Sequence, residues 1–179
     1  DTATTAYGTA GVADATRGLI YGGSWASAAN ETIEYVTISS TGNTTDFGNM
    51  TTAREGGRQG GGSTTRGMQA GGLTSGHESD VTDYVTIASA GDATDFGNLV
   101  DDWVGGGVAS SNVRFVLSGG QTAVADQNVM QYFTIASTGN STDFGDLTVA
   151  TRDVHNGGAN GVRGITNMGG RGPRATVVD

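Results

Sequence analysis

The chain has 179 residues, of which 32 are Gly, nine are basic, 18 are acidic and none is Cys, giving a formal net charge of −9. This length fits one domain. The acidic balance excludes the basic patch that nucleic-acid binding needs. The absence of Cys excludes disulfide scaffolds and thiolate metal sites, and no run of 18 apolar residues predicts a membrane span. We therefore expect no nucleic-acid partner, no membrane insertion and no cofactor.

The chain repeats itself at intervals of about 48 to 50 residues. Each unit carries an Arg followed by a Gly pair, and three units then carry a Phe at a fixed distance. These positions are Arg17, Arg66, Arg114 and Arg163; Gly22 and Gly23, Gly71 and Gly72, Gly119 and Gly120, Gly169 and Gly170; and Phe47, Phe96 and Phe144. The regularity indicates duplication within a single repeat domain, with units at about 7–50, 56–99, 104–147 and an incomplete 152–179.

Each unit is interpreted as four short strands with almost no helix. In chain order these are a Gly- and Ala-rich strand such as 57–63, a strand from the Arg to the Gly pair such as 17–23, and a third strand. The third strand, 33–38 or 81–87, is rich in β-branched and aromatic residues and partly alternates. A Thr-Gly-Asn or Ala-Gly-Asp turn then leads to the fourth strand, for example 46–50, and we expect a tight hairpin there.

The expected fold is all-β, a β-propeller or part of one, built of four-stranded antiparallel blades. The chain holds about three and a half units, whereas propellers typically have four to eight blades. Two alternatives would explain this number. Either the tail 175–179 forms a short third strand that completes a four-bladed ring, or further blades precede Asp1 in a longer array. We favour the second alternative, in which an open array can also close against another chain.

The pattern of a strand ending in Gly-Gly, a variable loop, a strand with a Tyr such as Tyr35 and a late aromatic resembles the kelch repeat. Where kelch repeats usually carry Trp, this chain has Asp-Phe-Gly. The longest shared segments, YVTISSTGNTTDFGN, YVTIASAGDATDFGN and YFTIASTGNSTDFGD, also look like tandem repeats in tail-associated structural proteins of marine bacteriophages. The kelch resemblance implies a propeller, and the phage resemblance implies a virion location.

An Asn or Asp followed three residues later by Asp recurs in the turn of three units. Oxygen ligands at this spacing could hold Ca²⁺. The alternative, which we favour, is that the first residue sets the turn and the second accepts backbone N–H groups. The residues are Asn43 and Asp46, Asp92 and Asp95, and Asn140 and Asp143.

The repeated Arg has two interpretations. A ring of Arg side chains could bind an anionic sugar or phosphate. The alternative is a structural Arg–Asp pair that joins strands or blades, with Asp46, Asp95 and Asp143 as partners. Strict repetition favours a structural role, because binding sites usually break symmetry.

The unrepeated residues after each Gly pair are the best candidates for ligand binding, since loops vary while the scaffold repeats. Trp25 either stacks on a sugar or partner or fills an interface between blades. The other candidates are His77, Asp80, Gln121 and Asp126.

Catalysis has little support, because neither His lies near a nucleophile motif and no unrepeated carboxylate pair suits glycoside hydrolysis. We expect a non-enzymatic module of a virion tail or fibre, on the virion surface or otherwise extracellular. Its partners would be other virion or surface proteins, copies of itself and a host-surface glycan. The alternatives are a secreted or surface-attached bacterial adhesin and, less favoured, a glycan-active enzyme on a propeller.

Overall fold

The computed structural model describes residues 7–25, 28–55, 57, 59–154 and 157–166. These residues contain sixteen strands, and no helix occurs among them. The expectation of an all-β chain is therefore confirmed for this part of the molecule. No described segment forms a helix that is long and apolar enough to cross a membrane.

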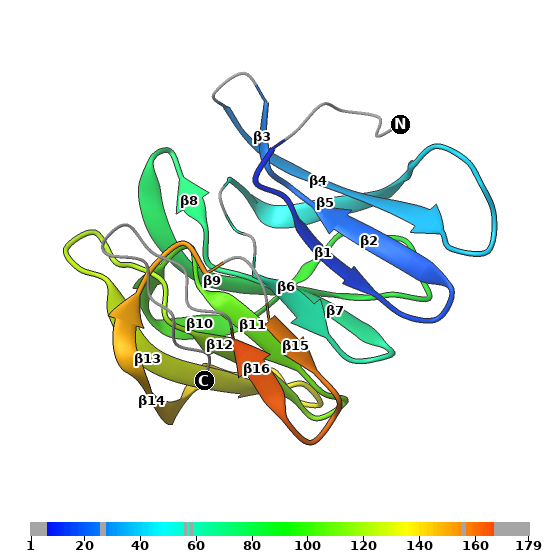
Figure 1. The fold of residues 1–179 in the computed structure, drawn as a ribbon. Helices are drawn as coiled ribbons and strands as arrows, with labels where there is room; N and C mark the ends of the chain where they lie inside the picture. The colour runs from blue at the N-terminus through cyan, green and yellow to red at the C-terminus, as the bar shows by residue number, and fades with distance from the viewer. Residues whose placement is uncertain (1–6, 26–27, 56, 58, 155–156, 167–179) are drawn as a thin grey trace.

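Each of the first three units forms an antiparallel sheet with four main strands, and a short fifth strand joins the sheet in units 1 and 2 (Figure 1). The sheet of unit 1 has the order β1-β2-β4-β5, with strands at Ala10–Ala13, Arg17–Tyr21, Ala28–Thr37 and Thr45–Arg54. Unit 2 has the order β6-β7-β9-β10, at Gly60–Gly62, Arg66–Ala70, His77–Thr86 and Thr94–Trp103. Unit 3 has the order β11-β12-β13-β14, at Gly107–Ser110, Arg114–Ser118, Gln127–Thr134 and Thr142–Thr151.

Short strands extend the hairpins that follow the Gly pairs of units 1 and 2. Strand β3, Ser24–Trp25, pairs with the start of β4, and β8, Leu73–Thr74, pairs with the start of β9. The third and fourth strands are longer than the sequence predicted, because the third begins at this hairpin and the fourth continues to residues 54, 103 and 151.

The turn between the first two strands of each unit is closed by one side-chain oxygen. In unit 1, Asp14 Oδ1 accepts hydrogen bonds from the backbone N–H groups of Thr16 and Arg17, at 2.6 and 2.7 Å. These bonds lower the pKa of Asp14, the bond from Arg17 most strongly. Ser63, Ser111 and Asn160 accept the corresponding bonds in the other units. The same position of the repeat therefore holds Asp, Ser or Asn in different units, because each of these side chains places an acceptor oxygen close to the backbone N–H groups of the turn.

The Gly pairs turn the chain out of the second strand through a backbone conformation that favours Gly. Gly22 and Gly23 have φ values of 50° and 101°, and Gly71 and Gly72 have 60° and 109°. A Cβ on Gly22 would also lie 2.9 Å from the carbonyl oxygens of Arg54 and Asn30. The Gly pair is thus required both for the bend and for close packing. The fourth pair, Gly169 and Gly170, lies outside the described residues.

The apolar core lies between units rather than within them. One cluster joins the unit 1 residues Leu19 and Phe47 to Val85 and Ile87 of unit 2. The second joins Met68 and Phe96 of unit 2 to Phe115, Phe133 and Ile135 of unit 3. Trp103, at the end of β10, is also buried in this second cluster. A single sheet therefore has no core of its own, and each unit is stabilised by its neighbours.

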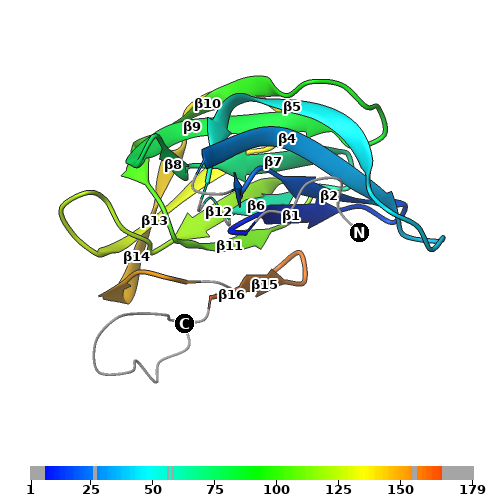
Figure 2. The ribbon, with the colours of Figure 1, turned by 90° about the horizontal axis from the view of Figure 1, so that it is seen from above.

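The fourth unit contributes two described strands, β15 at Gly157–Ala159 and β16 at Gly164–Thr166. This hairpin lies beside β11 at one end of the row of first strands (Figure 2). The hydroxyl groups of Thr166 and Ser118 are hydrogen-bonded at 3.0 Å. The tail 175–179, considered as a third strand, lies outside the described residues.

The Thr-Gly-Asn turns do not close a tight hairpin, which corrects the prediction from sequence. Seven residues, 38–44, separate β4 from β5. In units 2 and 3, the Gly of this turn and the residue two positions later bond to the preceding unit instead. In unit 2, the N–H of Gly91 donates to the Phe47 carbonyl at 2.7 Å, and the N–H of Ala93 donates to the Asn49 carbonyl at 2.7 Å. Gly139 and Ser141 of unit 3 bond to Phe96 and Asn98 in the same way. The turns of units 2 and 3 thus bond along the outer strand of the unit before them.

This contact makes the Gly of the Asp-Phe-Gly segment a test of the packing between units. We predict that Gly97→Ala lowers the free energy of unfolding by roughly 1–3 kcal/mol more than Gly145→Ala. A Cβ on Gly97 would lie 2.4 Å from the Gly139 carbonyl oxygen, whereas a Cβ on Gly145 would meet nothing within 4 Å. Both residues have positive φ, 142° and 128°, so the difference isolates the contact. Urea unfolding measures it, and equal losses would contradict the prediction.

Candidate functional site

Each of the first three units contains a stack of Arg, Tyr and Phe side chains. The Arg17 guanidinium lies 4.9 Å from the centroid of the Tyr35 ring, and this ring meets Phe47 edge-on at 6.0 Å. In unit 2, Arg66, Tyr84 and Phe96 repeat the arrangement with distances of 4.7 and 5.5 Å. The Arg is held over the Tyr because the second and third strands pair in register, with Leu19 opposite Tyr35. The planar guanidinium can stack in this way while its N–H groups remain directed at other acceptors.

The stacked Arg connects its own unit to the next one. Arg17 Nη1 donates to the Ile87 carbonyl of unit 2 at 2.9 Å, and Arg66 Nη1 donates to the Ile135 carbonyl of unit 3. The structure does not show the suggested ion pairs of these Arg residues with Asp46 and Asp95, since the guanidinium groups donate to carbonyl oxygens of the next unit instead. Within the described residues, the ion pairs join Arg54 to Asp83 and Arg152 to Asp126.

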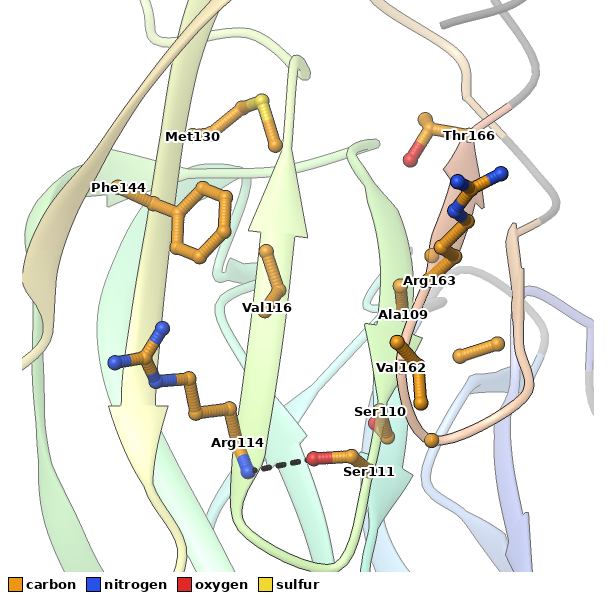
Figure 3. A pocket seen from close by; sticks show the side chains of 13 residues that line it. Ala109, Ser110, Ser111, Arg114, Val116, Met130, Phe144, Val162, Arg163 and Thr166 are labelled. Atoms are coloured by element: carbon orange, nitrogen blue, oxygen red, sulfur yellow. Dashed lines mark hydrogen bonds between the residues drawn. The ribbon is translucent and has the colours of Figure 1, made fainter.

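In unit 3 the same stack borders an open cavity. Arg114 lies 4.5 Å from the Tyr132 ring centroid and 5.9 Å from that of Phe144. The cavity has a volume of about 290 Å³ between the unit 3 sheet and the β15–β16 hairpin. Figure 3 shows Phe144 beside Met130 and Val116 on one wall, with Arg163 on the hairpin opposite. Two guanidinium groups and an apolar floor thus line the same opening.

The exposure of Phe144 distinguishes this cavity from the two closed interfaces. Phe47 and Phe96 are each 2% exposed, because the third strand of the next unit covers them, whereas Phe144 is 46% exposed. Arg114 lies at the rim, where its backbone N–H donates to Ser111 Oγ at 3.0 Å. Chemically, this cavity suits an occupant that has an apolar side chain and a carbonyl or anionic oxygen for the guanidinium.

The Asn/Asp turn residues serve the contact between units. Asp92 Oδ1 accepts the backbone N–H of Asn49 at 2.9 Å, and Asn140 Oδ1 accepts that of Asn98 at 3.1 Å. Asp143 Oδ1 accepts the N–H of Gly145 within its own strand. Asn43, Asp46 and Asp95 occupy equivalent positions. Among the described residues, no group of three His, Cys, Asp or Glu side chains is arranged to hold a metal ion.

The unrepeated candidates lie on the hairpins that follow the Gly pairs. His77 is exposed at the start of β9, and Asp80 accepts a hydrogen bond from the Asn98 amide. Gln121 and Asp126 are brought together in unit 3, where both contact the Arg152 side chain, at 3.4 and 3.2 Å. The Trp25 backbone pairs with Ala28 in the unit 1 hairpin, and its side chain lies outside the description. The structure thus joins Gln121 to Asp126 and leaves His77 and Asp80 on another unit.

A buried ion pair at the interface of units 1 and 2 was not found from the sequence. Arg54 Nη2 lies 2.6 Å from Asp83 Oδ2, with both side chains fully buried, and Arg54 Nη1 donates to the Val81 carbonyl. Thr51 Oγ1 donates to Asp83 Oδ1, and Gln69 Oε1 accepts from Arg54. Burial lowers the pKa of Arg54, while Asp83 opposes that shift. Arg54 has no counterpart in the other units, so the repeat pattern gave no signal for it.

We predict that Arg54→Met lowers the free energy of unfolding by about 3–5 kcal/mol, because it leaves Asp83 buried without its partner. The double variant Arg54→Met/Asp83→Leu should recover most of this loss. Arg152→Met is the matched control: its pair with Asp126 is about one-third exposed, so a loss of at most about 1 kcal/mol is expected. Urea denaturation of the four proteins measures the effect, and equal losses for both Arg variants would refute it.

No protein-family model matches the sequence, and no curated protein matches it either.

Proposed function

We propose that the chain is a non-enzymatic structural and recognition module, part of a propeller-like array that presents variable hairpins to a host-surface glycan or protein. The observation that carries the proposal is the separation of repeated from unrepeated residues. Repeated positions such as Arg17, Phe47 and Gly91 make the contacts between units. The unrepeated candidates His77, Gln121 and Asp126 lie on the hairpins after the Gly pairs.

These hairpins share one edge of the stacked sheets. Within each unit, the hairpin that follows the Gly pair leaves the end of the second strand, opposite the turn closed by Asp14 or its equivalents. Neighbouring units are joined at this edge, where Leu73 of the unit 2 hairpin pairs with Glu55 at the end of unit 1. Figure 1 shows β3 and β8 projecting on the same side. Several variable segments side by side would form one composite recognition surface on a rigid scaffold.

A virion location is the second part of the proposal, supported by the resemblance of the repeat to tail-associated phage proteins. Many copies of a weakly binding module on one particle would give strong attachment through multivalency. The acidic charge of the chain suits a protein that must not adhere to nucleic acid.

Binding to a microarray of bacterial surface polysaccharides tests the recognition role. We predict that the full chain binds a glycan and that Trp25→Ala/His77→Ala/Val124→Ser lowers binding by at least roughly tenfold, because a tenfold loss corresponds to contacts worth on the order of 1.4 kcal/mol. Val124 is 91% exposed at the tip of the unit 3 hairpin.

The matched control is Val113→Ser, because Val113 is also exposed but lies in the turn at the opposite edge. Loss of binding with this control, or binding unaffected by the hairpin variant, would contradict the proposed surface. Release of sugar products would instead indicate an enzyme. Immunogold labelling of particles with an antibody against the chain tests the virion location separately.

A further inference from the structure

The outer face of unit 3 has the same repeated residues as a surface that the next unit covers in units 1 and 2. Among the described residues, no segment covers this face of unit 3 in the same way. In unit 1 this surface is covered by β9 and the loop that follows it, and in unit 2 by β13 and its loop. Each interface buries an Ile from the next unit, Ile87 or Ile135, against the Phe of the unit before. Each also accepts the N–H of a loop Gly at the Phe carbonyl, and an Arg N–H donates to the Ile carbonyl.

The elements that would receive such an occupant are all present on unit 3. Phe144 and Arg114 stand at the positions of Phe47 and Arg17. A Cβ on Gly145 would meet nothing within 4 Å, whereas one on Gly48 would lie 2.4 Å from Gly91. The opening is therefore shaped for the same backbone approach that closes the other two interfaces.

The opposite end of the array shows the complementary feature. Ile38 of unit 1 is 54% exposed, while the equivalent Ile87 and Ile135 are 0% and 2% exposed. A Cβ on Gly42, in the turn that follows Ile38, would also meet nothing within 4 Å. The side of the unit that normally inserts into its predecessor is thus uncovered in unit 1, just as the receiving side is uncovered in unit 3.

We propose that the outer face of unit 3 is a docking surface for the third- and fourth-strand hairpin of a further repeat unit that carries the Tyr-Val-Thr-Ile sequence. The β15–β16 hairpin already occupies the place of the first and second strands of that unit. A whole unit of a second copy would collide with β15–β16, so the occupant is a hairpin and not a complete sheet. Its third strand pairs with β16 as β13 pairs with β12. This inference does not depend on the proposed host recognition.

A synthetic peptide with the sequence of residues 77–103, which forms the third and fourth strands of unit 2, serves as the probe for the full chain. We predict that calorimetry detects binding, and that hydrogen exchange slows at Gly164–Thr166 because β16 gains a partner strand. Phe144→Asp should weaken binding by at least roughly tenfold, since it replaces the central apolar contact. Phe144 is half exposed in the absence of the peptide, so this change leaves the fold intact.

The matched control is Val149→Asp, because Val149 is on the same strand and is also 46% exposed. This variant should bind the peptide as the unchanged chain does, and a peptide with Ile87→Asp should not bind. No binding, equal binding of a scrambled peptide, or binding without protection of β16 would overturn the proposal. Dimerisation of the chain alone, lost with both Ile38→Asp and Phe144→Asp, would also overturn it in favour of a second copy as the occupant.

Discussion

The close approach of two glycine backbones across each interface is the constraint on which the stacking depends. A Cβ on Gly48 would lie 2.4 Å from the Gly91 carbonyl oxygen, and the same distance separates a Cβ on Gly97 from Gly139. With side chains absent here, the loop of one unit bonds directly to the outer strand of the unit before it. The apolar contacts and the Arg stack then follow at fixed distances. Because no unit has a core of its own, this contact between neighbours determines whether the array forms.

The two complete interfaces share a frame but differ in how their deepest position is filled. At the first, Arg54 meets Asp83 and Gln69. At the second, the equivalent positions hold Trp103, Gln131 and Leu117, and Gln131 Oε1 accepts the Val100 N–H at 2.9 Å. The residue corresponding to Asp83 keeps its role as an acceptor for the preceding strand in both. Equivalent positions in the two interfaces therefore hold a charged pair in one case and largely apolar side chains in the other.

Much of the unit architecture could be predicted from the sequence, because repetition makes weak signals accumulate. The strand from the Arg to the Gly pair, the four strands in each unit and the absence of helix in the described part of the chain agree with a sequence whose strand-forming residues recur at a constant spacing. The prediction of a tight hairpin at Thr-Gly-Asn was wrong. The local turn sequence does not reveal that Gly91 and Asp92 contact a strand some 43 residues earlier. Local sequence propensities reflect contacts between residues that are close in sequence, whereas Gly91 and Asp92 make their contacts with residues of the neighbouring unit.

The candidate site was less accessible from the sequence for a related reason. Phe144 looks identical to Phe47 and Phe96 in the repeat, and only the packing of the following unit distinguishes them. The role of Arg54 could not be predicted from the repeat, because this residue departs from the repeated pattern and its buried charge depends on Asp83 of the next unit. The pairing of Gln121 and Asp126 through Arg152 likewise requires the curvature of the hairpin, which spacing alone does not give.

The Arg54–Asp83 pair also bears on how such an array can change its number of units through evolution. Loss of the middle unit would place Arg54 against Gln131, and a second copy of the middle unit would place Trp103 against Asp83. Either event leaves a charged side chain buried in the interface without its partner. The free-energy cost can approach the total stability of a domain. Repeat number at this junction is therefore coupled to compensating substitutions, so insertions and deletions of whole units should be tolerated more readily where the interface is apolar.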